Sequence, residues 1–207
     1  MDVTVLKEGV KDRELRGKTT NRNPCASSVT LIKSSSCVIV DTGGRGDEQL
    51  ILDRLGEEGV NPSEVEYVIC THWHPDHTSN NHLFKDANLI IGETFWPPHE
   101  NSNHSTWDNN VKEIEGVEII RTPGHVPEHL SVIAHAHKEY VIAGDAFYED
   151  DLRKGKIPQA YSNKKQFKES LKKVIQTADV IIPGHGRVIE LDDKLRKELM
   201  GLADRLD

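Results

Sequence analysis

The stretch Thr71-His72-Trp73-His74-Pro75-Asp76-His77 is the most informative part of this chain, because four of its seven residues can bind a metal ion. Imidazole nitrogens and carboxylate oxygens are donors that divalent metals commonly take from proteins. The segment directly before it, Tyr67-Val68-Ile69-Cys70, is apolar and rich in strand-forming residues. The pattern therefore predicts a buried strand that ends in a loop of metal ligands at the rim of a sheet.

Three further metal-binding residues repeat this arrangement later in the chain. His125 follows a Thr-Pro-Gly turn, Asp145 ends an apolar run, and His185 lies in a Pro-Gly-His-Gly turn after another apolar run. Each is a donor at the carboxyl end of a predicted strand, next to a glycine that lets the backbone turn tightly. We expect these side chains to converge with the first cluster on one shared site.

The number of donors predicts two metal ions, since one zinc ion usually takes four ligands. The predicted ligands of the first ion are His72, His74 and His125, those of the second ion are Asp76, His77 and His185, and Asp145 bridges the two. Asp145 takes the bridging position because a carboxylate has two oxygens, whereas an imidazole offers one lone pair.

Such a pair of ions defines the chemistry that the site can perform. Two ions about 3.5–4 Å apart can share a water molecule and lower its pKa towards about 7. Asp76 is the predicted catalytic residue, because it would bind the second ion, orient the attacking oxygen and carry a proton away. Zinc suits the nitrogen and oxygen donors, with iron or manganese as alternatives. Cys70 lies next to the cluster, but its place in a buried strand predicts a packing role.

Apolar runs alternate with amphipathic stretches along the rest of the chain. The sequence predicts strands at residues 29–33, 37–41, 67–71, 88–92, 117–121, 130–135, 140–145, 180–183 and 187–190. It predicts helices at residues 47–58, 164–178 and 194–205, the last capped by Asp192. Residues 92–110 show no clear period, which predicts an irregular surface loop with packed aromatic residues, or else a substrate lid or a dimer contact.

The composition is that of an ordinary globular chain. Its 207 residues suit one domain, and no run of about 18 apolar residues predicts a membrane span. The start Met1-Asp2-Val3-Thr4 lacks the basic and apolar pattern of a signal peptide. The three cysteines form no CxxC pair, which argues against a disulfide framework or a cysteine-rich zinc site and favours a reducing, cytoplasmic compartment.

The motif series HxHxDH, TPGH, GD after a strand, and PGHG resembles that of the metallo-β-lactamase superfamily. The matching order runs from about Val29 to Glu190, and the turn Asp41-Thr42-Gly43-Gly44 fits the family's early strand-end aspartate. The resemblance implies an α/β fold of the four-layer αββα sandwich type, with a dinuclear site at one edge of two packed sheets. We expect a single such domain over residues 1–207.

Features that the chain lacks narrow the branch of the family. Lactamases of the commonest zinc class carry a cysteine where Asp145 stands. Glyoxalase II shares the seven ligands but adds a helical C-terminal domain, for which the segment after Gly186 is short. Nucleases of the cleavage-and-polyadenylation type insert a domain between Asp145 and His185 that is absent here.

The chain resembles a compact animal branch of the family at the stretches Val38–Gly44, Ser131-Val132, Ala143-Gly144-Asp145 and Ala178-Asp179-Val180. That resemblance implies a zinc-dependent endoribonuclease acting on replication-dependent histone pre-mRNA, as a homodimer in cytosol and nucleus. A small-molecule thioester or lactone hydrolase of the glyoxalase II type is the alternative. A non-enzymatic metal or interaction protein is a third hypothesis, against which the intact ligand set argues.

The sequence gives mixed signals about single-stranded RNA as a substrate. The segment Arg153–Lys173 is basic and fits phosphate contacts, although a solvated helix face is the simpler explanation. A net charge of −8 and an aromatic content of 5% argue against an extended RNA surface. His99, His104 and His129 are candidates for acting near the leaving group, or else ordinary loop and strand-edge histidines.

Overall fold

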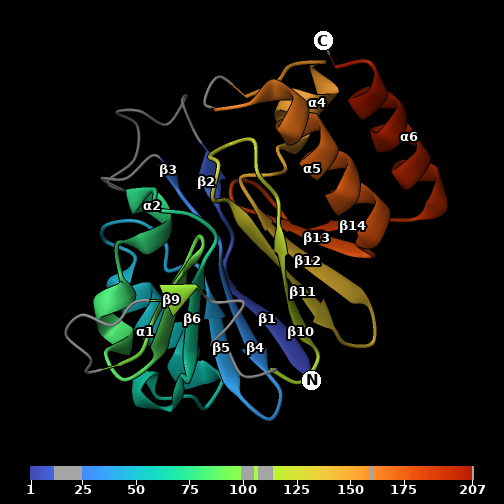
Figure 1. Ribbon diagram of the computed structural model, residues 1–207. Helices are drawn as coiled ribbons and strands as arrows, with labels where there is room; N and C mark the ends of the chain where they lie inside the picture. The colour runs from blue at the N-terminus through green and yellow to red at the C-terminus, as the bar shows by residue number, and fades with distance from the viewer. Residues whose placement is uncertain (12–24, 99–104, 107–113, 159–160, 207) are drawn as a thin grey trace.

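The computed structural model describes residues 1–11, 25–98, 105–106, 114–158 and 161–206. Two β-sheets pack face to face, and helices cover the outer side of each sheet (Figure 1). This arrangement is the four-layer αββα sandwich that the motif series implies.

The first sheet has the strand order β1-β4-β5-β6-β7-β8-β9. Its strands are β1 (Asp2–Lys7), β4 (Val29–Lys33), β5 (Cys37–Val40), β6 (Tyr67–Cys70), β7 (Asn88–Ile91), β8 (Thr94–Trp96) and β9 (Ser105–Thr106). Strands β5, β6 and β7 run parallel, and the outer pairs are antiparallel. The segments between them form α1 (Glu48–Glu57), α2 (Pro75–Thr78) and the 3₁₀ turns η1 (Pro62–Glu64) and η2 (Asn81–Phe84).

The second sheet has the strand order β10-β11-β12-β13-β14. Its strands are β10 (Val117–Arg121), β11 (Leu130–His135), β12 (Glu139–Gly144), β13 (Val180–Pro183) and β14 (Ile189–Glu190). The helices on this side are α4 (Glu149–Arg153), α5 (Lys164–Thr177) and α6 (Asp193–Asp204). A separate hairpin pairs β2 (Val10–Lys11) with β3 (Cys25–Ala26).

The hydrophobic residues form three cores, one at each interface between neighbouring layers. Ile39 of β5 packs with Ile51 of α1, whereas its neighbour Val38 belongs to the core between the sheets, together with Ile142. Val141 belongs to the core under α5 and α6. Successive strand residues point to opposite faces, so strands buried on both faces read as continuous apolar runs.

The strand directions explain why the predicted ligands meet at one edge. Strands β10 and β12 are both antiparallel to β11, and β12 is parallel to β13, so all three end at the same side of the sheet. His125, Asp145 and His185 follow these three ends. The HxHxDH cluster follows β6 of the facing sheet. Opposite sheets therefore contribute ligands to a common edge.

The expectation of an irregular surface loop at residues 92–110 is wrong for two segments. Thr94–Trp96 forms β8 and pairs antiparallel with β7, and Ser105–Thr106 forms β9 and pairs antiparallel with β8. Gly92 makes the turn with a φ of 53°. A strand of three residues that ends at Pro97 is too short to show a period in the sequence, and its pairing partner determines its structure. Residues 99–104 and 107–113 lie outside the described residues, so the lid and dimer alternatives stay predictions.

No helix in the described parts of the chain is long and apolar enough to cross a bilayer.

Candidate metal centre

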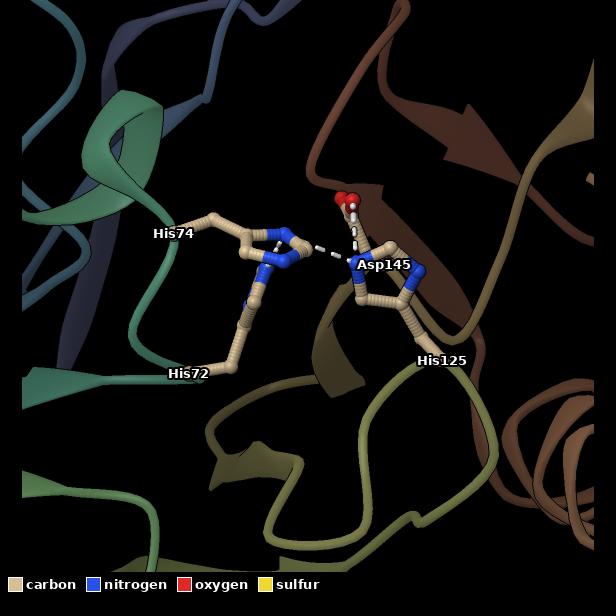
Figure 2. Close-up of side chains that lie close together, drawn as sticks. All are labelled: His72, His74, His125 and Asp145. Atoms are coloured by element: carbon tan, nitrogen blue, oxygen red, sulfur yellow. Dashed lines mark hydrogen bonds and ion pairs between the residues drawn. The ribbon is translucent and has the colours of Figure 1, made fainter. Parts of the chain in front are cut away.

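Four donors converge in a first group at the edge between the sheets (Figure 2). The Nδ1 atom of His74 lies 2.8 Å from Nε2 of His72 and 3.0 Å from Nε2 of His125. Nε2 of His125 lies 3.4 Å from Oδ2 of Asp145. Ring nitrogens so close together repel one another if each presents a lone pair, unless a proton or a cation lies between them. The arrangement therefore fits a metal ion with three nitrogen donors and one oxygen donor.

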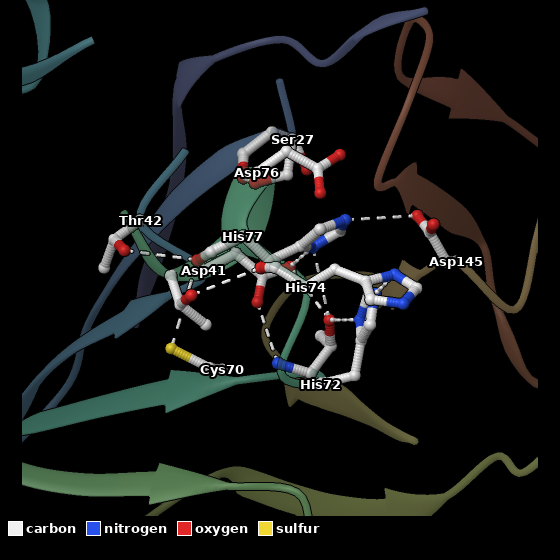
Figure 3. Close-up of polar contacts among 12 residues, drawn as sticks. Ser27, Asp41, Thr42, Cys70, His72, His74, Asp76, His77 and Asp145 are labelled. Atoms are coloured by element: carbon white, nitrogen blue, oxygen red, sulfur yellow. Dashed lines mark hydrogen bonds and ion pairs between the residues drawn. The ribbon is translucent and has the colours of Figure 1, made fainter. Parts of the chain in front are cut away.

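The other oxygen of Asp145 belongs to a second group. Its Oδ1 atom lies 3.3 Å from Nε2 of His77 and 3.5 Å from Nε2 of His185. The same His185 nitrogen lies 3.3 Å from Oδ2 of Asp76. Figure 3 shows His77 and Asp76 on the chain segment that also carries His72 and His74. Asp145 thus presents one oxygen to each group, as expected of a bridging ligand.

Two buried atoms of the second group support a cation there. His77 Nε2 and Asp145 Oδ1 lie 3.3 Å apart as an ion pair, and neither has a hydrogen-bond partner within the described structure. An unsatisfied buried polar atom costs about 1–3 kcal/mol. A divalent ion between these atoms would satisfy both, so the residues present fit the metal centre.

Carboxylates and histidines shift one another's pKa values across the site. Burial would lower the pKa of His77, but Asp41 and Asp145 raise it well above its usual value. Against the same effect of burial, Asp145 and Asp76 raise the pKa of His185 to about 10. A metal ion would therefore replace protons on these two rings. Burial would raise the pKa of Asp145, but the neighbouring His77 and His185 hold it well below its usual range. Burial would also raise the pKa of Asp76, yet a hydrogen bond from His185 and the charge of His77 lower it to about 2. Burial lowers the pKa of His72 well below its usual value, so this imidazole is neutral and keeps a lone pair for a metal. The site holds carboxylates ionised that a divalent cation would neutralise.

Asp41 fixes the orientation of His77. Its Oδ2 atom accepts a hydrogen bond from His77 Nδ1 at 2.7 Å, which leaves Nε2 directed at the second group (Figure 3). Its Oδ1 atom accepts a hydrogen bond from the backbone N–H of Thr71 at 2.8 Å. Asp41 has a φ of 55°, a left-handed conformation that is uncommon outside glycine. A carboxylate behind a metal-binding histidine raises its basicity and fixes its tautomer.

His129 supports the backbone of Asp145 and has no access to a leaving group. Its Nε2 accepts from the Asp145 N–H at 3.1 Å, so Nδ1 carries the proton and donates to Thr122 Oγ1 at 2.9 Å. Thr122 can then donate to Ser131 Oγ at 2.8 Å, and Ser131 donates to the carbonyl of Ala143 at 3.0 Å. Burial lowers the pKa of His129 to about 3. Of the two interpretations of His129, the structure supports the structural one.

Tyr148 is a residue of the site that the sequence patterns do not indicate. Its hydroxyl donates a hydrogen bond to Asp145 Oδ2, and its ring stacks on His185 with centroids 6.1 Å apart. Burial and the charge of Asp145 raise the pKa of Tyr148 well above its usual value, so it stays a phenol. The only available signal is its position three residues after Asp145. A cleft of about 420 Å³ opens beside Tyr148 and His185 and extends to Arg153 and Arg187.

Two glycines next to the ligands are required by close approach. A Cβ on Gly184 would lie 2.3 Å from Asp145 Oδ1, inside the second group. A Cβ on Gly124 would lie 2.2 Å from the backbone nitrogen of Phe167, so glycine lets helix α5 pack directly against the His125 turn. The glycines that mark these motifs in the sequence thus bring the ligand turns into contact.

The remaining candidate residues lie where the structure gives them other roles or no description. Cys70 is fully buried in β6, and its thiol contacts Asn81 Oδ1 at 3.3 Å, which fits the predicted packing role. His99 and His104 lie outside the described residues. All seven predicted ligands lie in the two groups, and their binding of metal stays a prediction.

Comparison with known protein families gives a match over the part of the chain that contains the ligand motifs. The family model described as the metallo-beta-lactamase superfamily matches residues 22–185. The chain belongs to the metallo-β-lactamase superfamily. Membership of this superfamily makes it a metal-dependent hydrolase and implies divalent metal binding.

The relatives include metallo-beta-lactamase domain-containing protein 1 of Xenopus laevis, which is 34% identical over 167 residues. The match covers 77% of this chain and 70% of the frog protein. The human protein of the same name is 34% identical over 155 residues, which cover 72% of this chain but 58% of the human protein. The resemblance to this branch of the superfamily, which the motifs predict, is therefore confirmed.

Two solved structures have the same fold. A probable metal-dependent hydrolase of Staphylococcus aureus has a TM-score of 0.66 at 16% identity, and the match covers 93% of this chain and 92% of that one. A quorum-quenching N-acyl homoserine lactone lactonase has a TM-score of 0.55 at 20% identity, with 77% of this chain and 78% of that one covered. At these identities the likeness shows the fold alone.

Proposed function

We propose that this superfamily member is a two-metal hydrolase that cleaves phosphodiester bonds in single-stranded RNA. The observation that carries the two-metal site is the position of Asp145, whose Oδ2 lies 3.4 Å from His125 Nε2 and whose Oδ1 lies 3.3 Å from His77 Nε2. One carboxylate thus joins two donor groups. Phosphodiesters suit such a site because attacking and leaving oxygens can each be stabilised by one ion.

The residues of the chain divide the work between holding ions and moving a proton. His72, His74 and His125 would hold one ion, Asp76, His77 and His185 the other, and Asp145 both. When bound, two zinc ions would supply an activated water molecule and stabilise developing negative charge. Asp76 lies at the rim of the second group, where its carboxylate would orient the attacking water and take its proton. The Tyr148 hydroxyl donates to Asp145, the carboxylate that both donor groups share, and so orients this ligand.

Support for RNA as the substrate comes from the related branch and from helix α5. The N–H of Ser162 donates to the carbonyl of His125 at 3.0 Å, so α5 begins beside the first group. Lys164 and Lys165 are exposed in the first turn of this helix. Farther along, Lys172 contacts Asp204 at 2.5 Å, so part of the basic segment is paired within the protein. Lys165 lies 4.0 Å from Glu169, a pair on the exposed helix surface. We propose the first-turn lysines for phosphate contacts because they lie nearest the first donor group.

The test compares zinc-loaded protein on single-stranded RNA, duplex RNA and a panel of thioesters and lactones. Cleavage of single-stranded RNA is expected, and Asp76→Asn lowers the rate by about 10²–10⁴-fold because a proton acceptor is lost. RNA cleavage that does not exceed the Asp76→Asn background means that this substrate is wrong.

A charge variant tests the RNA contact separately. Replacing Lys164 and Lys165 by alanine removes two charges, so the dependence of RNA affinity on salt should weaken by roughly one phosphate contact per lysine that binds. The matched control replaces Lys194 and Lys197, which are exposed on α6, and should leave affinity unchanged. Equal effects of both variants would show that the α5 lysines act only through overall charge.

A small-molecule lactone or thioester hydrolase is the second candidate, favoured by Tyr148 and the adjoining cleft. A buried phenol aimed at the metal ligands can donate a hydrogen bond to a carbonyl oxygen as it becomes an oxyanion. Lactone turnover that falls in Tyr148→Phe, with no RNA cleavage, would favour this candidate over the nuclease.

A further inference from the structure

The thiol of Cys25 lies at the rim of the second donor group. Cys25 begins β3 of the N-terminal hairpin, and its Sγ atom is 3.3 Å from Oδ2 of Asp76 and 3.9 Å from Nε2 of His185. One ligand atom from each of these three residues lies within 4.8 Å of the others. Cys25 and His185 are 160 residues apart and form no cysteine motif, so the sequence gives no sign of this proximity.

Independent atoms show that this space is suited to a cation. His77 is fully buried and Asp145 is 3% exposed, and His77 Nε2 and Asp145 Oδ1 find no hydrogen-bond partner among the described residues. Both belong, with His185, to the same donor group. His185 belongs both to this group and to the group that contains Cys25. The thiol therefore lies beside a cation site that His77 and Asp145 indicate without any contribution from Cys25.

Backbone contacts set the position of the thiol. Two residues after Cys25, the N–H of Ser27 donates to the carbonyl of Asp76 at 3.0 Å. On the paired strand β2, the carbonyl of Val10 accepts from His185 Nδ1 at 3.3 Å, which leaves Nε2 for a metal ion. Both strands of the hairpin are therefore attached to residues of the second group. The hairpin presents Cys25 to this group as a fixed part of the site.

We propose that Cys25 is a sulfur ligand of the second metal ion and biases that position towards zinc. The inference rests on the proposed two-metal site. On binding, the S–H bond breaks, the proton passes to solvent, and a sulfur lone pair forms the bond to zinc. Thiolate favours zinc over manganese, which prefers oxygen donors. This cysteine comes from the N-terminal hairpin, not from the position of Asp145, where many lactamases have theirs.

Cobalt substitution of the full chain tests the proposal without any substrate. Filling the second position with Co²⁺ should produce a near-ultraviolet charge-transfer band from sulfur to cobalt. The band should be absent in Cys25→Ser and kept in the control Cys37→Ser, whose residue lies at the other end of β5 from Asp41. Serine at an exposed position keeps a polar side chain, and circular dichroism verifies the fold of both variants.

Two further measurements give the expected size of the effect. Cys25→Ser should weaken zinc binding at the second position by at least about 10-fold, while manganese binding stays unchanged. The loss of a residue that only supports a ligand already costs about 10-fold in metal affinity, and the loss of a ligand should cost no less. Zinc should also slow alkylation of Cys25 by iodoacetamide about 10-fold or more by the same affinity argument.

The outcomes separate this inference from the proposed function. Two bound Co²⁺ ions without the sulfur band, and alkylation unaffected by zinc, would overturn the role of Cys25 and leave the two-metal site intact. A chain that binds one ion at most would overturn both. Absence of RNA cleavage leaves the cobalt result unaffected, because no readout here depends on turnover.

Discussion

The two donor groups share Asp145 but differ in protection and in donor chemistry. The first group is rich in nitrogen, and two of its histidines, His72 and His125, are 0% and 4% exposed. The second extends from the fully buried His77 to the half-buried Asp76 and the exposed Cys25, and it mixes nitrogen, oxygen and sulfur. One bridged site can thus combine a preformed metal position with an adaptable one at the rim. We expect the first position to bind metal tightly and the second to exchange it.

The largest expected effect is that of removing the shared ligand. Asp145→Ala takes one donor from each group, so metal content should fall below one ion per chain. Activity should fall by more than about 100-fold, because the loss of a residue that only supports a ligand already lowers activity by up to about 100-fold. Metal analysis and steady-state kinetics measure both effects, with Asp193→Ala, an exposed position on α6, as control. Two retained ions would contradict the bridging role of Asp145.

Asp76→Asn should separate the two groups. The substitution affects only the second group, so the first ion should remain bound while kcat falls by about 10²–10⁴-fold, as expected for a lost proton acceptor. Metal content and kcat are measured on the same preparation. Loss of both ions would show that the groups bind cooperatively and that the contrast between them is wrong.

Asp41→Asn should weaken the second position without touching a ligand. Asparagine tolerates the left-handed backbone at this position, but its amide cannot accept from His77 Nδ1 and from Thr71 as the carboxylate does. Zinc affinity at the second position should fall about 10–100-fold. Competition with a chelator resolves the two binding steps. An equal loss at both positions would show that Asp41 acts on the whole edge.

The smallest effect is expected from the hydrogen bonds that support the backbone of Asp145 through His129. Thr122→Val removes the hydroxyl that accepts a hydrogen bond from His129 Nδ1–H, which leaves this buried donor without its partner. The free energy of unfolding should fall by about 1–3 kcal/mol, while metal content stays at two ions per chain. Urea denaturation and metal analysis test this. A lost ion at unchanged stability would instead assign the chain of hydrogen bonds to metal retention.

The sequence predicts the buried strands, and the ligands that follow them, better than it predicts the short elements outside these strands. Strands such as Val117–Arg121 and Leu130–His135 agree in both bounds, because strands buried between layers need continuous apolar residues. The ligands are predictable because each follows such a strand. Thr94–Trp96 and Glu149–Arg153 are not, since three to five residues are too few to show a period.

Contacts between distant segments limit what the sequence reveals about the site. Cys25, Tyr148 and the supporting role of His129 depend on how the hairpin, α4 and β11 meet the ligand turns. No local pattern encodes these meetings. The four-layer arrangement itself was predicted only through the resemblance of the motifs to a known family.

The division of ligands between the two sheets couples metal binding to folding. Each group takes donors from the segment after β6 and from the ends of the second sheet, so neither group exists until both sheets are formed and packed. Ions that bind only the native state stabilise it by mass action, about 4 kcal/mol for free metal at 1,000 times its dissociation constant. The metals then act as cross-links between the two halves of the sandwich, and chelation lowers the stability of the whole fold.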